Sequence, residues 1–317
     1  MNPYVFIVGC SRSGTTLLRR MVDAHPEIAI TPETHWITQF SKRRTGLSDD
    51  GHVTSATVTA LRGQSKFPKL GVEPAQLERL LSTDGPLSFA RFVTAVFDLY
   101  GRQRGKALVG DKTPGYVRDI HTLHALWPRA RFVHIIRDGR DVCLSALNWK
   151  RKADDFRRRF PTWDEDPVTT AALWWRWHVE LGRRVGMRLP PGLYREVRYE
   201  TLVQEPEDTC RTLCAFLDLP YEDAMVRFHE GRTRRKPGLD AKHAWLPPTP
   251  GLRDWESQMP ADVLERVEAA AGDLLDELGY ARGAGPPDAE REEETARIAA
   301  RFVAAAPKPW MPLPDGW

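Results

Sequence analysis

The chain has 317 residues, of which 41% are hydrophobic and 28% are charged, and its formal net charge is +3. These proportions are close to those of globular proteins and exclude the disordered and fibrous classes. The mild positive charge argues against a dedicated nucleic-acid-binding protein. No stretch approaches the roughly 18 uncharged apolar residues of a membrane-spanning helix. No basic segment precedes the first apolar run, so we expect neither a signal peptide nor export, and we expect a cytoplasmic protein.

The first part of the chain begins with a strand pattern and continues with helical patterns. An apolar run at 4–9 predicts a buried strand, and the apolar spacing of 15–25 predicts a helix. A second helical pattern starts at Glu33, after Pro32, and continues to about residue 44. The polar stretch 45–70 is expected to be an exposed connection. Two amphipathic helices are expected after it, at 74–81 and 88–100.

The rest of the chain repeats the alternation of strands and helices. A short apolar run at 107–110 stops at Asp111, and the remaining patterns predict a helix at 115–127, a strand at 131–136, a helix to about Trp149, a basic stretch at 150–159, a Trp-rich helix at 168–184, a strand at 193–199, and helices at 206–217, 260–278 and 290–305. Such alternation implies a parallel sheet covered by helices on both faces. We predict a P-loop-type three-layer α/β domain over 1–280, followed by a C-terminal helix and Pro/Trp tail over 281–317.

A glycine-rich loop follows the first strand and leads into the first helix. The sequence GCSRSGTT at 9–16 has the glycine spacing of a P-loop, in which backbone N–H groups and a helix N-terminus hold phosphate oxygens. NTP-hydrolysing proteins have a lysine after the second glycine, and Thr15 stands there in this chain. The positive charge is instead inside the loop. We therefore expect an anion site built by Ser11, Arg12, Ser13, Gly14, Thr15 and Thr16.

A second candidate anion site follows the strand at 131–136. Arg137 leaves this strand at its carboxyl end, where parallel sheets open onto their ligand crevice. Ser145 lies about two turns into the next helix, so both side chains can share one ligand group. The alternative interpretation is an exposed salt-bridge cluster at a helix start, formed by Arg137, Asp138, Arg140 and Asp141.

Together these segments resemble the donor site of sulfotransferases that use 3′-phosphoadenosine-5′-phosphosulfate (PAPS). The resemblance is closest to tyrosylprotein-type sulfotransferases and their bacterial relatives. It is carried by RSGTTLLRRMVDAHPEIAITPET from Arg12, DKTP from Asp111 and RYETLVQEPE from Arg198. It implies that the first loop holds the 5′-phosphosulfate and that Arg137 and Ser145 hold the 3′-phosphate.

The resemblance also implies catalytic roles. Glu33 matches the proposed catalytic glutamate of the tyrosylprotein relatives and would take the proton of the acceptor. A helix-start acid favoured by the helix dipole is the alternative interpretation of Glu33. His35 is a competing base, because its intrinsic pKa is near neutral. Lys112 and Arg12 would stabilise the charge that develops on the oxygen between sulfur and phosphorus.

Two further residues resemble positions near the nucleotide. Tyr199 matches a strand-end residue of the family, although a core tyrosine is the alternative. Arg253, in GLRDW, stands where relatives carry a basic residue over the 3′-phosphate, but Asp254 replaces the lysine of the tyrosylprotein form. No acid that would hold Mg²⁺ follows the buried strand, so PAPS is expected as donor, PAP as product, and no metal is expected.

The sequence leaves the acceptor open. The Trp cluster at 174–177 fits core packing better than an acceptor platform, and the basic stretch at 150–159 fits a lid, an acidic-acceptor site or a solvated charge run. We expect a bacterial enzyme acting on a small phenol, sugar or nucleoside, or on tyrosine, without nucleic-acid or membrane partners and with a homodimer left open. Two rivals remain: a P-loop kinase or NTPase, which predicts Mg²⁺-dependent ATP binding, and a non-catalytic nucleotide-binding protein, which predicts donor binding without turnover.

Overall fold

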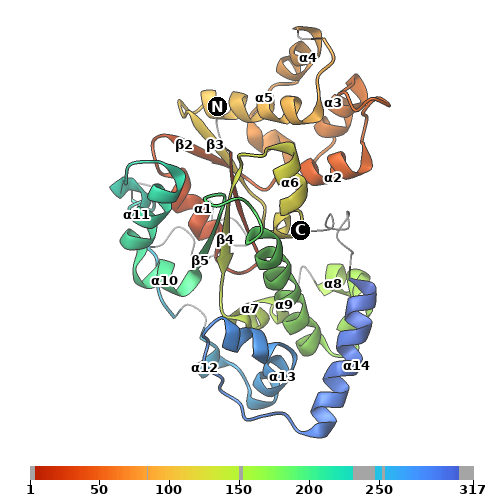
Figure 1. Cartoon of the computed structure of the whole chain (residues 1–317), viewed down its shortest axis with the longest axis vertical. Helices are drawn as coiled ribbons and strands as arrows, with labels where there is room; N and C mark the ends of the chain where they lie inside the picture. Colours follow the sequence, from red (N-terminus) through yellow and green to blue (C-terminus); the bar gives the residue numbers. More distant parts are fainter. Residues whose placement is uncertain (1–3, 84, 150–152, 231–246, 252–253, 307–317) are drawn as a thin grey trace.

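A five-stranded parallel sheet forms the centre of the protein. The computed structural model describes residues 4–83, 85–149, 153–230, 247–251 and 254–306. The strand order is β2-β3-β1-β4-β5, and helices cover both faces (Figure 1). The strands are β1 (Val5–Gly9), β2 (Ile28–Thr31), β3 (Leu108–Lys112), β4 (Arg131–Ile136) and β5 (Tyr194–Arg198). The α/β architecture predicted from the alternating patterns is therefore confirmed.

The register of the sheet brings the strand ends to one edge. Thr31 on β2 pairs with Asp111 on β3, and Ile7 on β1 pairs with Lys112. Gly9, the last residue of β1, pairs with Ile135 on β4. Because all strands are parallel, the residues that follow them leave the sheet at the same edge, which is where ligands bind in such folds.

Side chains alternate along β1 between two buried faces. Val5 and Ile7 belong to one cluster, with α1 (Thr15–Asp23) and α11 (Pro206–Leu217). Phe6 and Val8 belong to the cluster on the opposite face. Successive strand residues point to opposite sides, so an unbroken apolar strand requires helices on both faces.

The connection from β2 to β3 is long and mostly helical. It contains α2 (Trp36–Arg43), α3 (Ser55–Arg62), a 3₁₀ turn (Phe67–Leu70), α4 (Pro74–Thr83) and α5 (Phe89–Arg102). The expectation that 45–70 is an exposed connection is wrong. Val58, Leu61, Phe67 and Leu70 are buried there, because a few widely spaced apolar side chains face the core between polar ones.

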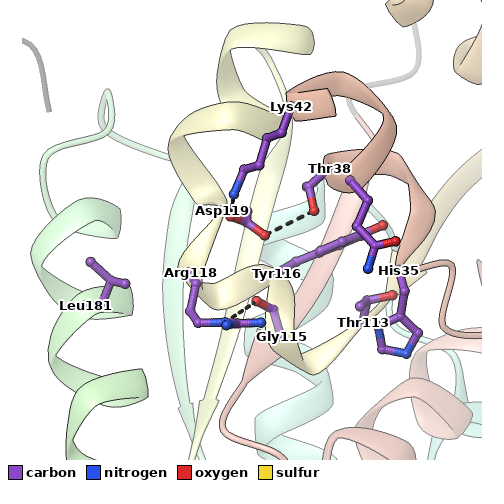
Figure 2. Close-up of a pocket in the computed structure, with 10 residues that line it drawn as sticks. His35, Thr38, Lys42, Thr113, Gly115, Tyr116, Arg118, Asp119 and Leu181 are labelled. Atoms are coloured by element: carbon purple, nitrogen blue, oxygen red, sulfur yellow. Dashed lines mark hydrogen bonds and ion pairs between the residues drawn. The ribbon is translucent and has the colours of Figure 1, made fainter. Parts of the chain in front are cut away.

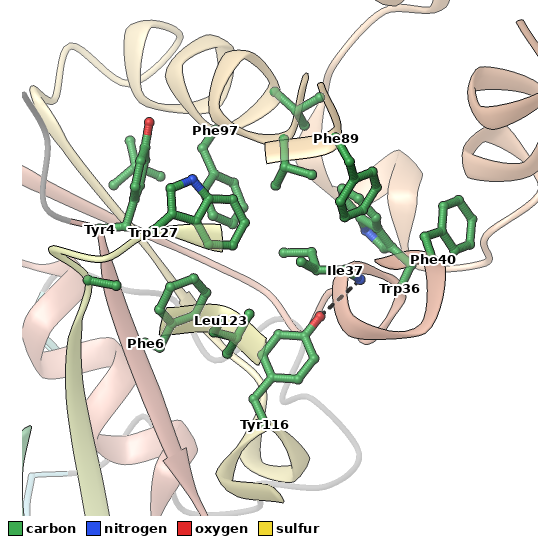
Figure 3. Close-up of a cluster of buried hydrophobic side chains, with 14 of the residues drawn as sticks. Tyr4, Phe6, Trp36, Ile37, Phe40, Phe89, Phe97, Tyr116, Leu123 and Trp127 are labelled. Atoms are coloured by element: carbon green, nitrogen blue, oxygen red, sulfur yellow. Dashed lines mark hydrogen bonds between the residues drawn. The ribbon is translucent and has the colours of Figure 1, made fainter. Parts of the chain in front are cut away.

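An aromatic cluster fixes this connection to the sheet (Figure 3). Phe6 of β1 stacks on Phe132 of β4, with ring centroids 5.6 Å apart, and lies edge-on to Tyr116. The hydroxyl of Tyr116 accepts a hydrogen bond from the backbone N–H of Ile37 at 3.2 Å. The start of α2 is therefore tied to the segment that follows β3, and both belong to the site described below.

The other end of the same face is covered by a second group of helices. It comprises α7 (Gly139–Leu147), α8 (Ala153–Arg159), α9 (Pro167–Gly186), α13 (Ala261–Glu277) and α14 (Ala289–Ala305), whereas α6 (Ile120–Leu126) packs in the cluster of Phe6 and Val8. Trp174 and Trp175 of α9 are buried among them, which confirms their core role. Phe302 of α14 stacks on Phe160, with centroids 4.7 Å apart. The division of the chain at residue 280 stays a prediction.

Some boundaries differ from the sequence-based expectations. Strand β2 and helix α10 (Tyr199–Gln204) were not predicted, because both are short. The helix expected at 115–127 is a 3₁₀ turn, Pro114–Arg118, followed by α6. The chain also has α12 (Trp255–Gln258) and 3₁₀ turns at Pro161–Trp163 and Asp223–Met225. Within the described residues, no helix is long and apolar enough to span a membrane.

Candidate active site

The glycine-rich loop between β1 and α1 presents unsatisfied donors. No side chain caps α1, whose N-cap is Gly14, so N–H groups at the helix start face the loop. The hydroxyl of Ser13 is buried and has no hydrogen-bond partner. Arg12 adopts a left-handed backbone conformation with φ 79°. Such strain costs of order 1–3 kcal/mol and is concentrated at functional sites. The loop therefore fits an anionic group, as its sequence predicts.

Tyr199 packs directly against this loop. A Cβ atom built on Gly14 would lie 2.3 Å from Cδ2 of Tyr199, so only glycine fits there. The guanidinium carbon of Arg137 lies 4.3 Å from the centre of the Tyr199 ring, at the distance of a cation–π contact. Tyr199 is thus a partly buried residue between the two candidate anion sites.

The structure places Ser145 next to Arg12. The Nε atom of Arg12 donates to Oγ of Ser145 at 2.7 Å. Arg137 donates to Oδ2 of Asp141 from Nη2 at 2.7 Å and from Nε at 3.2 Å. The prediction that Arg137 and Ser145 share one ligand group stays a prediction.

The exposed salt-bridge interpretation of this segment is wrong. Arg137, Asp138, Arg140 and Asp141 are all buried. Arg140 pairs with Asp138 and Glu268, each at 2.7 Å, and thereby ties α7 to α13. Buried charges persist only when they are paired and hydrogen-bonded, so Arg140 has a structural role.

The segment after β2 is held against the segment after β3. Thr31 donates to Oδ2 of Asp111 at 2.7 Å, and Thr113 Oγ1 accepts from the backbone N–H of Thr34 at 3.0 Å. The hydroxyl of Thr34 is 2.7 Å from that of Tyr116. These contacts hold the segment outside the helix, and α2 starts only at Trp36. The helix-start interpretation of Glu33 is therefore wrong, since Glu33 precedes the helix.

Glu33 is the centre of a cluster of cationic and imidazole groups. Its Oε1 accepts from Nζ of Lys112 at 2.7 Å, and its Oε2 accepts from Nζ of Lys66 at 2.7 Å. Nε2 of His35 lies 3.0 Å from the same Oε2. Lys112 also donates to the hydroxyl of Thr16 at 3.4 Å. One buried lysine therefore connects the anion-binding loop to the candidate base.

The charges in this cluster are mutually stabilising. Burial opposes the ionisation of Glu33, but hydrogen bonds from His35 and the charge and hydrogen bond of Lys112 outweigh it, so the pKa of Glu33 is far below its usual range. Burial lowers the pKa of Lys112, and Glu33 partly offsets this effect. Glu33 is consequently a carboxylate at neutral pH.

Lys66 was missed by the sequence analysis. It is the residue before the 3₁₀ turn at 67–70, within the stretch expected to be an exposed connection. Phe67 and Leu70 are buried and anchor this turn, which directs Lys66 onto Glu33 and His35. No local pattern distinguishes Lys66 from Lys69, the other lysine of the stretch, because the partner of Lys66 lies 33 positions earlier.

Arg253 lies outside the described residues. The neighbouring Trp255 donates its backbone N–H to Oδ1 of Asp141 at 3.0 Å, and its ring lies 3.6 Å from the guanidinium carbon of Arg140. Among the described residues, no group of three or more His, Cys, Asp or Glu side chains is arranged to hold a metal ion.

A family model for the sulfotransferase family matches residues 3–223, most of the chain. The chain belongs to the sulfotransferase family. It is a sulfotransferase, an enzyme that moves a sulfuryl group to an acceptor hydroxyl. The kinase and non-catalytic alternatives are thereby set aside.

Relatives and solved structures agree with this assignment. Protein-tyrosine sulfotransferase A of Caenorhabditis elegans is 26% identical over 92% of this chain and 71% of its own length. Protein-tyrosine sulfotransferase 1 of Homo sapiens is 27% identical over 90% and 72%. The sulfotransferase domain from the curacin biosynthetic pathway shares the fold, with a TM-score of 0.59, 21% identity, and coverage of 89% of this chain and 99% of that domain.

The sulfotransferase has a cavity of about 190 Å³ beside the Glu33 cluster (Figure 2). It lies between α2, the 3₁₀ turn that follows β3, and α9, and His35 and Thr113 form the side nearest Glu33. The lining is mainly polar and includes Thr38, Lys42, Arg118 and Asp119.

Proposed function

We propose that this sulfotransferase takes PAPS as its donor and a small hydroxylated molecule as its acceptor. The observation that carries the proposal is the position of Lys112, which contacts both Thr16 of the loop and Glu33. The donor binds at the anion-binding loop, and the acceptor must bind next to the group that takes its proton. Lys112 contacts both, so donor and acceptor would meet beside it.

The loop Ser11–Thr16 fits the sulfated phosphate of the donor. The partnerless hydroxyl of Ser13, the uncapped N–H groups of α1 and the charge of Arg12 are suited to its oxygens. We assign the 3′-phosphate to the side of Arg137 and Ser145, with Tyr199 and Arg253 beside the nucleotide. When bound, PAPS supplies a sulfuryl group joined to phosphate through one oxygen.

Glu33 would take the proton of the acceptor hydroxyl. Its carboxylate is ionised, and its affinity for a proton rises when Lys112 or Lys66 turns away from it, because each cation holds its pKa down. His35 touches the same Oε2 and is the second candidate base. Lys112 and Arg12 would stabilise the charge left on the donor phosphate, which is worth about 3–4 kcal/mol for one such group.

The assignment of cellular context belongs to the same proposal. We place the enzyme in the bacterial cytoplasm, with a phenol, sugar, nucleoside or tyrosine as acceptor, no nucleic-acid or membrane partner, and a homodimer left open. We also propose turnover without a metal, since Arg and Lys side chains can supply the positive charge.

Calorimetric titration with PAP, and with ATP in the presence and absence of Mg²⁺, tests the donor assignment. Tight, metal-independent binding of PAP that Arg137→Ala weakens at least tenfold supports it. Arg188→Ala is the matched control, because Arg188 is an exposed arginine outside the site. Preference for Mg-ATP, or equal PAP binding by Arg137→Ala and Arg188→Ala, would contradict the donor site.

A further inference from the structure

The cavity beside Glu33 is small and continuous with the catalytic cluster. Its volume of about 190 Å³ is below the roughly 300–1,000 Å³ of pockets for drug-sized ligands. His35 lines the cavity and also touches Glu33, so a hydroxyl at this end of the cavity is near the candidate base. The space therefore suits a molecule with a single ring.

The charges that line the cavity are unevenly paired. Asp119 accepts a hydrogen bond from Lys42 at Oδ1 and another from Thr38 at Oδ2, the latter at 3.0 Å (Figure 2). The positive charge of Lys42 is therefore paired with the carboxylate of Asp119. Among the described residues, Arg118 makes one long hydrogen bond, from Nε to the backbone oxygen of Gly115 at 3.3 Å, and its guanidinium carbon lies 5.4 Å from the centre of the Trp177 ring. In the described part of the chain, no carboxylate oxygen lies within 4.0 Å of its guanidinium group.

A second arginine strengthens the positive field at this end of the cavity. Arg159, the last residue of α8, has no ion pair with any described residue. Burial lowers the pKa of Arg118, the charge of Asp119 opposes this, and the charge of Arg159 lowers it further. Asp119 acts on Arg118 from beyond ion-pair distance, so this partly buried cation can still gain from an anionic ligand that contacts it directly.

We propose that this cavity is the acceptor site and that it selects one-ring hydroxylated acceptors that carry a carboxylate. The guanidinium group of Arg118 binds the carboxylate, and the acceptor hydroxyl is directed toward Glu33. Arg is suited to this role because its planar donors match the two oxygens of a carboxylate. The inference rests on the proposed function, whose acceptor class it narrows.

The test compares 4-hydroxyphenylacetate with 4-hydroxyphenylacetamide, which has the same ring and hydroxyl but no charge. Each is titrated by calorimetry into wild-type protein saturated with PAP, so that the donor loop cannot bind the carboxylate. We expect the acid to bind at least tenfold more tightly than the amide. Arg118→Met should abolish this preference, whereas Arg157→Met should keep it, because Arg157 of α8 is exposed and already paired with Asp154 and Asp164.

The possible results separate the two proposals. Equal affinities of acid and amide for the wild type, no binding of either, or a preference that survives Arg118→Met would overturn the carboxylate site. The comparison on wild-type protein does not depend on the folding of any variant. If PAP itself does not bind, the donor assignment fails, and the same titrations on the free protein still decide whether Arg118 selects the acid.

Discussion

Replacement of Gly14 by alanine tests how closely the donor loop and Tyr199 are packed. Two costs add at this position. The first is the left-handed backbone, φ 88°, which costs a non-glycine residue roughly 1–2 kcal/mol. The second is the contact of the new Cβ with the Tyr199 ring at 2.3 Å, and overpacking of this kind typically costs about 1–3 kcal/mol. The free energy of unfolding should therefore fall by about 2–5 kcal/mol.

Gly192 provides the matched control. Its φ is 84°, but no described atom lies within 4 Å of a Cβ built there, so Gly192→Ala should show only the backbone cost of roughly 1–2 kcal/mol. Urea denaturation of both variants measures the difference. Tyr199→Ala in the Gly14→Ala background should remove the steric part, and the double-mutant cycle reports its size.

The same variants probe the donor site. Displacement of Tyr199 moves the ring that contacts Arg137, so Gly14→Ala should weaken PAP binding at least tenfold, and Gly192→Ala should leave it unchanged. If Gly14→Ala destabilises the protein no more than Gly192→Ala does, the close packing of loop and ring described above is incorrect.

Three other predictions follow from the Glu33 cluster and its neighbour Asp111. Glu33→Gln should lower kcat by about 10²–10⁴ while PAP binding persists, and a loss below tenfold in a PAP-release assay would remove Glu33 as the base. Lys66→Met should lower kcat/KM about fivefold, because a partly exposed charged hydrogen bond is worth about 1 kcal/mol, whereas Lys69→Met should have no effect, because Lys69 is an exposed residue of the same turn. Burial raises the pKa of Asp111 to about 6, although the hydrogen bond from Thr31 opposes this effect. Protonated Asp111 therefore contributes its full stabilisation below pH 4, and this stabilisation is lost as the pH rises through 6. Relative to Asp111→Asn, the wild type should lose up to about 3 kcal/mol between pH 4 and 7.5 in urea denaturation, and parallel pH profiles would contradict this.

The donor side of the site could be predicted from the sequence because its signals are local. The glycine spacing of 9–16 lies within one strand–loop–helix unit. Arg137 directly follows the predicted strand at 131–136, so its place at the end of a strand can be predicted from the sequence. Parallel strands place such residues at one edge of the sheet, so their proximity follows from the fold. Glu33 and Lys112 were chosen by resemblance, and the structure brings them within 2.7 Å.

The remaining contacts depend on packing between distant segments. Ser145 was expected beside Arg137, but Arg12, 133 positions away, reaches it in the structure. The cavity near Arg118 forms where α2, the turn after β3 and α9 meet, and no periodicity in any one of them indicates it. Short-range patterns report which face of an element is buried, but they carry no information on which segments face each other.

The long connection between β2 and β3 has a consequence for folding. Glu33 and Lys112 are 79 positions apart, and the segment with the helices α2 to α5 is closed into a loop when β2 and β3 pair. Non-local parallel pairing is slow, because the entropy of closing the chain is lost before the contacts form. The strands that carry the donor loop and Arg137 pair across an even longer separation, since Val5 of β1 pairs with Arg131 of β4. We therefore expect the capacity to bind nucleotide and the capacity to transfer a sulfuryl group to appear together, late in refolding.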